Sequence, residues 1–187
     1  MSLRQLPNLI CIARILLVVP TAVSLYRGDF RLTLVLFLVA ALSDGLDGFL
    51  AKRFGWQTEL GKLLDPLADK LLLVTVFIML TVVGITPLWL TVLVVARDVV
   101  IGAGASVYSL WFGPLGGRPT AISKVNTLVQ LLYVLGAVSQ QAFGWPPAAA
   151  LLVLGALVLI TTAISGIDYV STYTRRARDV ARARRAA

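Results

Sequence analysis

Residues 44–69, DGLDGFLAKRFGWQTELGKLLDPLAD, place four aspartates between two long apolar stretches. Asp44 and Asp47 close the first stretch, and Asp65 and Asp69 open the second. Residues three or four apart share one face of a helix, so each pair is expected on a single face. An ionised carboxylate is expensive in a segment that enters a membrane. Four of them at the ends of two such segments therefore indicate a function.

The flanking stretches belong to a chain that is apolar almost throughout. Of its 187 residues 58% are hydrophobic, and the mean hydropathy is +0.88. A helix needs about 20 mostly apolar residues to cross a bilayer. The sequence therefore predicts an all-α integral membrane protein with six transmembrane helices, forming a single membrane domain over residues 1–187. The expected segments are 8–26, 32–53, 61–83, 88–110 and 123–140, and a sixth from the Pro146-Pro147 link to Tyr169.

The links between the segments differ in charge, and this difference predicts the topology. The links near Gly84 and Gly144 carry no charge. If six spans alternate, nearly all cations in the links or at the ends of the segments fall on the other side: Arg4, Lys52, Arg53, Lys62, Arg118, Lys124 and the tail from Arg175 to Arg185. Cytoplasmic links are rich in Lys and Arg, so both termini and the four aspartates are expected at the cytoplasmic face. The basic tail at about 171–187 is expected to be an interfacial helix on anionic lipid or a simple topology anchor.

Composition excludes several classes of function. The chain has no histidine, which rules out histidine catalysis and histidine ligation of a metal. Cys11 is the single cysteine, so neither a disulfide framework nor a thiolate metal cluster is expected. The net charge of +8 lies at segment ends and in the tail rather than on one soluble face. Membrane lipids and phosphorylated substrates are therefore the expected partners, and nucleic acid is not.

The four aspartates need a counter-charge. Carboxylates gathered at the ends of two neighbouring helices repel one another and take up protons unless a cation neutralises them. Such sites suit divalent ions that prefer oxygen ligands, such as Mg²⁺, Mn²⁺ or Ca²⁺. Gly45, Gly48 and Gly61 lie beside the acids, and glycine allows a ligand to approach the backbone closely. The other interpretation is an interfacial belt of ion pairs with the neighbouring lysines and arginines.

The same residues carry a resemblance to a known family. The pattern D-x-x-D-G-x-x-A-R, eight residues, then G-x-x-x-D-x-x-x-D is the signature of the CDP-alcohol phosphotransferase family. The matching positions are Asp44, Asp47, Gly48, Ala51, Gly61, Asp65 and Asp69. The chain departs at Lys52, where the family usually has arginine, so the bidentate fork is lost or moved to Arg53. The resemblance covers essentially the whole chain, since the family is described as six transmembrane helices with this signature spanning helices two and three.

The resemblance implies a fold, a reaction and a site. Family members are six-helix membrane proteins, usually homodimers, and the implied activity is phospholipid synthesis. A phosphatidyl group would pass from CDP-diacylglycerol to a glycerol-type hydroxyl with release of CMP, at the cytoplasmic face of a membrane such as the bacterial inner membrane. The residues implied to hold two ions of Mg²⁺ or Mn²⁺ are Asp44, Asp47, Asp65 and Asp69, and Asp69 is also the implied general base. The residues implied to contact the CDP group are Gly48, Ala51, Lys52 and Gly61.

Residues outside the signature bear on the acceptor. Arg97, in the middle of the fourth segment, is expected to contact an anionic substrate group or to pair with Asp98. Lys124 and Asn126 lie in PTAISKVNT at 119–127, which resembles cardiolipin synthases of this family. Phosphatidylglycerophosphate synthases resemble G-K-x-K-T here, with a second lysine at the position of Asn126. The missing cation favours phosphatidylglycerol as the acceptor, and glycerol 3-phosphate is the alternative.

A cation transporter or channel is the alternative of another class. It would also place acidic residues inside a membrane. Acids that line an ion path are expected through the whole depth of the membrane. The outer halves of the second and third segments contain none. The sequence therefore favours the enzyme.

Overall fold

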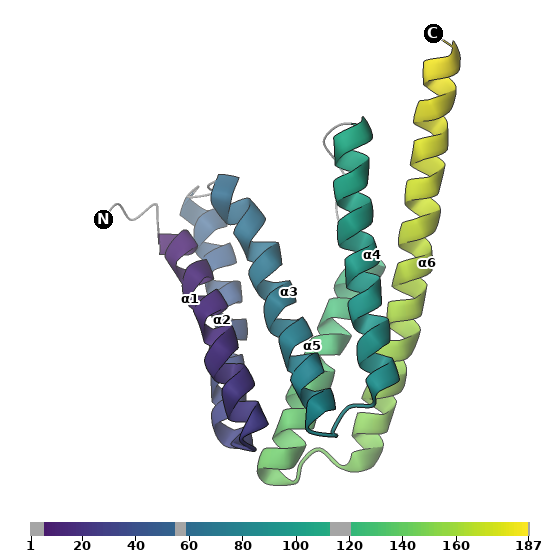
Figure 1. Cartoon of the computed structure of the whole chain (residues 1–187). Helices are drawn as coiled ribbons and strands as arrows, with labels where there is room; N and C mark the ends of the chain where they lie inside the picture. Colours follow the sequence, from purple (N-terminus) through teal and green to yellow (C-terminus); the bar gives the residue numbers. More distant parts are fainter. Residues whose placement is uncertain (1–5, 55–58, 113–120, 187) are drawn as a thin grey trace. The chain divides into compact units, whose positions relative to one another are not determined.

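The computed structural model of the chain (Figure 1) describes residues 6–54, 59–112 and 121–186. Side chains are described for residues 10–43, 68, 70–104, 121–169 and 171. Within the described ranges the chain forms six helices and no strand, which confirms the predicted all-α fold. The helices are α1 (Leu6–Tyr26), α2 (Phe30–Phe54), α3 (Glu59–Val82), α4 (Leu88–Phe112), α5 (Ala121–Phe143) and α6 (Ala148–Ala186).

The described helices group into two compact units. The first unit comprises Met1–Pro87 and Val134–Leu151, and the second comprises Leu88–Tyr133 and Leu152–Ala187. Helices α1, α2 and α3 thus belong to the first unit, together with the second half of α5. Helix α4, the first half of α5 and most of α6 make up the second. The single membrane domain over residues 1–187 stays a prediction.

A tight turn joins α1 to α2 in the first unit. Gly28 has a φ of 76°, a left-handed conformation that glycine adopts without strain. Asp29 Oδ1 accepts a hydrogen bond from Leu32 N at 3.1 Å, which caps the start of α2. Across the turn the Oγ of Ser24 and the Oγ1 of Thr33 are hydrogen-bonded at 2.8 Å. The two helices therefore form an antiparallel hairpin with a defined register.

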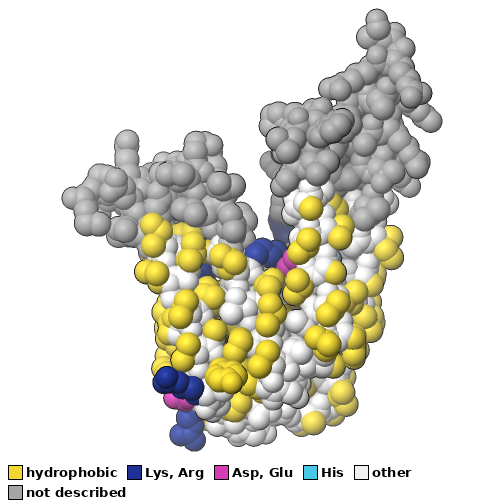
Figure 2. Space-filling model, in the orientation of Figure 1, with side chains coloured by type: hydrophobic (Ala, Val, Ile, Leu, Met, Phe, Trp, Pro, Cys, Tyr) yellow, Lys and Arg dark blue, Asp and Glu magenta, His cyan; other side chains and the backbone are white. Residues whose placement is uncertain are grey.

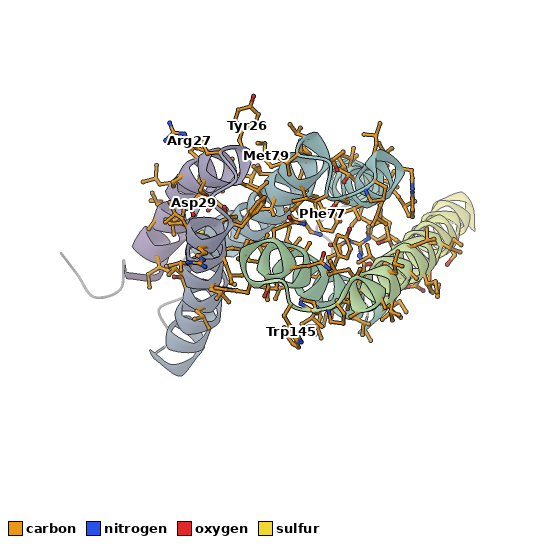
Figure 3. The ribbon with its side chains drawn as sticks, turned by 90° about the horizontal axis from the view of Figure 1, so that it is seen from below. Tyr26, Arg27, Asp29, Phe77, Met79 and Trp145 are labelled. Atoms are coloured by element: carbon orange, nitrogen blue, oxygen red, sulfur yellow. The ribbon has the colours of Figure 1, made fainter. Side chains whose placement is uncertain are left out.

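Helix α1 packs against both α2 and α3 in the first unit. It contacts α2 along the hairpin and also contacts α3 (Figure 1). Phe37 of α2 and Phe77 of α3 are buried. Figure 3 shows Phe77 directed inward, while Tyr26 and Arg27 point outward where α1 ends. Tyr26 and Arg27 thus face away from the interior, whereas Ser24 and Thr33 at the same end are buried and hydrogen-bonded to each other.

Large apolar side chains cover the outer surfaces of the described helices. Leu16 is 68% exposed, Leu152 75% and Ile167 71%. Figure 2 shows such side chains spread over the described part of the visible face rather than gathered in one patch. A surface of this kind fits lipid better than water, since exposed apolar area of this extent is rare in soluble monomers.

The described residues contain two helical stretches long and apolar enough to cross a membrane. These stretches are Ala121–Phe143 and Ala148–Tyr169. Shorter apolar helices in the described part are Ile10–Tyr26, Phe30–Ser43 and Lys70–Val82. The number of six spans and the cytoplasmic position of both termini stay predictions.

Helix α6 continues past Tyr169, where the sixth segment was expected to end. Its 39 residues measure about 58 Å at a rise of 1.5 Å per residue. A bilayer core is only about 30 Å thick, so the helix is longer than one span needs. After Tyr169 the sequence has no Gly or Pro to end a helix. The basic tail is therefore a helical continuation of α6, and its contact with anionic lipid stays a prediction.

Candidate active site

The four aspartates of the signature lie in two helices of the first unit. Asp44 and Asp47 belong to α2, and Asp65 and Asp69 belong to α3. Asp44 lies ten residues before the end of α2, and Asp69 ten residues after the start of α3. Each is therefore about 15 Å along its helix from the link that joins the two helices. The side chains of all four lie outside the described residues, so the metal-ligand set stays a prediction.

In α2 the aspartate positions continue a buried row. Thr33, Phe37 and Ala40 are 0%, 1% and 0% exposed and follow one face of the helix. Positions 44 and 47 come next at the same spacing of four and three residues. The sequence and the helical register thus bring both positions into line with the buried face of α2.

The same relation holds in α3. Leu80, Val76 and Leu72 are buried and follow one face. Positions 69 and 65 continue this row toward the start of the helix, again at a spacing of three and four residues. Because α1 packs against both α2 and α3, two rows that end in aspartates lie on helices with a common neighbour. The donor set along these rows, four carboxylates, has the chemistry that Mg²⁺ or Mn²⁺ requires.

The described side chains offer no competing metal centre. Among them, no group of three or more cysteine, aspartate or glutamate residues could hold an ion. The residues expected near the CDP group are also in α2 and α3, with side chains outside the described part of the chain: Gly48, Ala51, Lys52 and Gly61. Their roles stay predictions.

Arg97 is the centre of a polar network in the second unit. Only 4% of its side chain is exposed. Its Nη1 donates to Asp98 Oδ1 at 2.7 Å, which forms the expected ion pair. Its Nη2 donates to Ser123 Oγ at 2.7 Å and to Ser165 Oγ. One guanidinium therefore joins α4, α5 and α6, and its orientation is fixed by hydrogen bonds to three side chains.

Asn126 lies about one turn of α5 beyond Ser123 and adds further buried polar contacts to the layer around Arg97. It is fully buried, and its Oδ1 accepts hydrogen bonds from Thr161 and Thr162 Oγ1, both at 2.9 Å. Lys124 is exposed on another side of α5. The structure thus brings Asn126 to the same buried side of α5 as Ser123, the partner of Arg97, and leaves Lys124 off that side.

The sequence reasoning did not single out the hydroxyl partners in this layer or Gln130. Gln130 is fully buried, four residues after Asn126, and neither of its amide atoms has a hydrogen-bond partner among the described residues. The signal was present in the spacing of Ser123, Asn126 and Gln130, which puts three polar residues on one face of an apolar helix. Polar residues on one face of a membrane helix are a mark of buried contacts between helices.

Comparison with known proteins identifies the family. A family model described as CDP-alcohol phosphatidyltransferase matches residues 4–169, which include most of both units. The chain therefore belongs to the CDP-alcohol phosphatidyltransferase family, whose members are membrane-associated. The resemblance inferred from the aspartate signature is confirmed.

Curated relatives carry two kinds of name. Human "Cardiolipin synthase (CMP-forming)" is 33% identical over 180 residues, with 88% of this chain and 60% of the relative covered. "Probable phosphatidylglycerophosphate synthase" of Mycobacterium tuberculosis is 31% identical over 183 residues, with 94% and 83% covered. "CDP-diacylglycerol--glycerol-3-phosphate 3-phosphatidyltransferase" of Pseudomonas fluorescens is 34% identical over 140 residues, with 68% and 69% covered. The chain spans about 60% of the length of the human relative.

Proposed function

We propose that this protein transfers a phosphatidyl group from CDP-diacylglycerol to a hydroxyl of a glycerol-type acceptor, releases CMP, and requires a divalent metal ion. One observation carries the proposal. All four aspartates of the signature are present, and their positions continue the buried faces of α2 and α3. Both aspartate pairs continue buried rows of helices that share α1 as a neighbour. Membership of the family supports the reaction class.

Asp69 is the proposed general base. The acceptor hydroxyl oxygen attacks the phosphorus of the phosphatidyl group, its proton passes to the Asp69 carboxylate, and the bond from phosphorus to the CMP oxygen breaks. CMP leaves with the bonding electrons, so no covalent intermediate on the enzyme is required. The divalent ions, when bound by Asp44, Asp47, Asp65 and Asp69, would neutralise the pyrophosphate and the charge that develops on CMP.

The donor is proposed to lie along the same two helices. Gly48, Ala51 and Gly61 have small side chains that leave room for the CDP group. Lys52 supplies a positive charge for the pyrophosphate, as a point charge rather than a bidentate fork. These residues and the aspartates fall within 26 residues of sequence, so a single helix hairpin would carry the donor site.

For the acceptor we favour phosphatidylglycerol, which makes the activity that of a cardiolipin synthase. Arg97, Lys124 and Asn126 are the proposed acceptor-side residues. Arg97 is a buried cation held in one orientation, as a subsite for a phosphate group needs. Asn126 is neutral, and a buried neutral amide suits a phosphodiester better than a dianionic monoester. Glycerol 3-phosphate is the second candidate, because a relative with that substrate in its name is 34% identical over 68% of this chain.

The proposed setting is a membrane, such as the bacterial inner membrane. Six spans with both termini and the aspartates on the cytoplasmic side would agree with the charge of the links. The exposed apolar side chains of the described helices support contact with lipid. A homodimer is proposed from the family resemblance alone. An ion path is disfavoured because the acids of α2 and α3 are confined to the half of each helix that adjoins the link between them.

The test of the acceptor is a comparison of lipid products. Purified protein is incubated with CDP-diacylglycerol and Mg²⁺, and phosphatidylglycerol or glycerol 3-phosphate is supplied separately. The proposal predicts cardiolipin with the first and little product with the second. Product formed only with glycerol 3-phosphate would establish the second candidate, and ion flux in vesicles without any lipid product would support a transporter.

A further inference from the structure

Arg14 is a buried cation in the middle of an apolar helix. It lies in α1, where it is 1% exposed and ranks among the largest fully buried side chains. A charged side chain inside a membrane segment is costly, and it faces the interior of a bundle where it can pair with another polar group. The signature and the acceptor-side network make no use of this residue. Its burial therefore calls for an anion within the first unit.

Arg14 belongs to the face of α1 that packs inside the first unit. Cys11, Arg14, Thr21 and Leu25 are all buried, and their spacing of three, seven and four residues follows one helix face. Ile12 and Leu16, on other sides of the same turns, are 45% and 68% exposed. Because α1 contacts both α2 and α3, this face is directed at the helices that carry the aspartates.

The register of the α1–α2 hairpin shows which residues of α2 lie level with Arg14 of α1. Ser24 and Thr33 are hydrogen-bonded across the two helices. Arg14 lies ten residues before Ser24, and Ser43 lies ten residues after Thr33, so they are level in an antiparallel pair. Asp44 is the next residue of α2, and its position continues the buried row of Thr33, Phe37 and Ala40.

Few acidic residues of the first unit other than Asp44 could pair with Arg14. The first unit contains six of the chain's nine acidic residues. Asp29 is exposed at the opposite end of the hairpin, about 15 Å or more from the level of Arg14. The others are Asp44, Asp47, Glu59, Asp65 and Asp69. Of these, Asp44 is the one that the register sets level with Arg14 on the helix joined to α1 by the turn.

We propose that Arg14 is a positioning residue of the metal site, which holds the Asp44 carboxylate by a charge-assisted hydrogen bond from its guanidinium. The proposal rests on the proposed function for the metal, but the pairing itself does not depend on catalysis. A guanidinium that donates to one oxygen of a carboxylate leaves the other oxygen for an ion and fixes its direction. It also offsets the repulsion among four carboxylates while no metal is bound.

The first test is a double-mutant cycle in metal-free protein. Thermal unfolding in detergent with EDTA is compared for the wild type, Arg14→Gln, Asp44→Asn and the double variant. The proposal expects each single variant to lower the midpoint, and the double variant to unfold at a higher temperature than Arg14→Gln alone, because both charges are then gone. Arg27→Gln is the matched control, since Arg27 is an exposed arginine at the other end of the same hairpin.

The second test is the affinity for Mn²⁺, measured by electron paramagnetic resonance without substrate. Arg14→Gln is expected to weaken binding about tenfold or more, as removal of a residue that orients a ligand does. Arg14→Lys should retain part of the affinity, and Arg27→Gln should retain all of it. Arg14→Lys keeps the charge, so it serves where the glutamine variant does not fold.

Three results would overturn the proposal. Additive destabilisation in the cycle with Asp44→Asn would show that the two side chains do not interact. If Arg14→Gln coupled with Asp69→Asn and not with Asp44→Asn, the partner of Arg14 would be Asp69. Unchanged Mn²⁺ affinity in both Arg14 variants, with a raised KM for CDP-diacylglycerol, would make Arg14 a substrate ligand. A wild type that binds no Mn²⁺ would instead count against the proposed function, and the metal-free cycle would still decide the pairing.

Discussion

At the scale of single residues, a charge buried inside apolar helices needs hydrogen-bonding partners close by. Arg97 shows this directly, because its guanidinium reaches Asp98 and two serines within one buried layer. An unpaired charge in such surroundings is strongly destabilising. The same reasoning applies to Asp69, for which the proposed partner is a metal ion.

We expect Asp69→Asn to lose transfer while it still binds CDP-diacylglycerol. An amide cannot accept the proton of the acceptor hydroxyl, and loss of a general base typically lowers the rate by about 10²–10⁴-fold. The rate of CMP release and the binding of the donor are measured on the same preparation. Full activity in this variant would remove the assignment of Asp69 as the base.

Arg97→Lys should separate the substrate role of this residue from its structural one. Lysine keeps the charge but cannot hold three partners as a planar fork, so we expect the KM for the acceptor to rise about tenfold, equivalent to about 1.4 kcal/mol. The control is Ser165→Ala, which removes a single hydroxyl from the same network. If both variants lose stability alike and neither changes the KM, Arg97 only holds the helices together.

At the scale of helices, the second unit is joined by hydrogen bonds in its interior. Asn126 accepts from two threonines of α6, and Tyr169 Oη donates to Ile101 O of α4 at 2.8 Å. Lipid-embedded helices gain little from apolar contact with one another, so such bonds and the close approach of small residues set their packing. Both features yield stability predictions.

Thr162→Val is expected to destabilise the protein more than Thr161→Val. The Thr162 hydroxyl donates to Asn126 Oδ1 at 2.9 Å, and its loss should cost about 1 kcal/mol. The Thr161 hydroxyl is also within hydrogen-bond distance of Leu157 O, at 2.7 Å, so its single hydrogen is shared. Unfolding by SDS titration measures the difference, and equal losses would show that both bonds contribute alike.

Two glycines of α4 form a matched pair for a packing test. A Cβ at Gly104 would lie 3.2 Å from Tyr169 Cε1, whereas a Cβ at Gly102 would meet nothing within 4 Å. Gly104→Ala should push Tyr169 aside and lower stability by about 1–2 kcal/mol. Gly102→Ala should be neutral or stabilise by up to about 1 kcal/mol, because alanine is the better helix former. The same SDS titration applies, and equal stability of the two variants would contradict this packing.

The sequence predicted the helices better than their contacts. Apolar length and the glycine turns predicted six helices, with ends that differ from the observed ones by a few residues. The helix of the sixth segment continues through the basic tail, because the tail contains no residue that stops a helix after Tyr169. The contacts of Asn126 with Thr161 and Thr162 depend on how α5 and α6 pack, and no spacing within one helix contains that information. The four aspartates were recognisable because their spacing within each helix is itself the signal.

At the scale of the whole molecule, composition and family membership agree on a lipid-synthesising membrane protein. The exposed apolar side chains fit a bilayer, and the four aspartates of the signature are confined to α2 and α3. A phosphatidyltransferase with a lipid donor needs both features, since the acyl chains of the donor lie in the membrane.

The central claim is metal-dependent transfer, and CMP release tests it most directly. Purified protein is reconstituted with CDP-diacylglycerol and phosphatidylglycerol, and CMP is followed with Mg²⁺, with EDTA, and after Mg²⁺ is restored in excess. We predict release of CMP in step with a new lipid product, its loss in EDTA and its return with Mg²⁺. Folded protein that releases no CMP with phosphatidylglycerol or with glycerol 3-phosphate, or that releases it equally well in EDTA, would contradict the account.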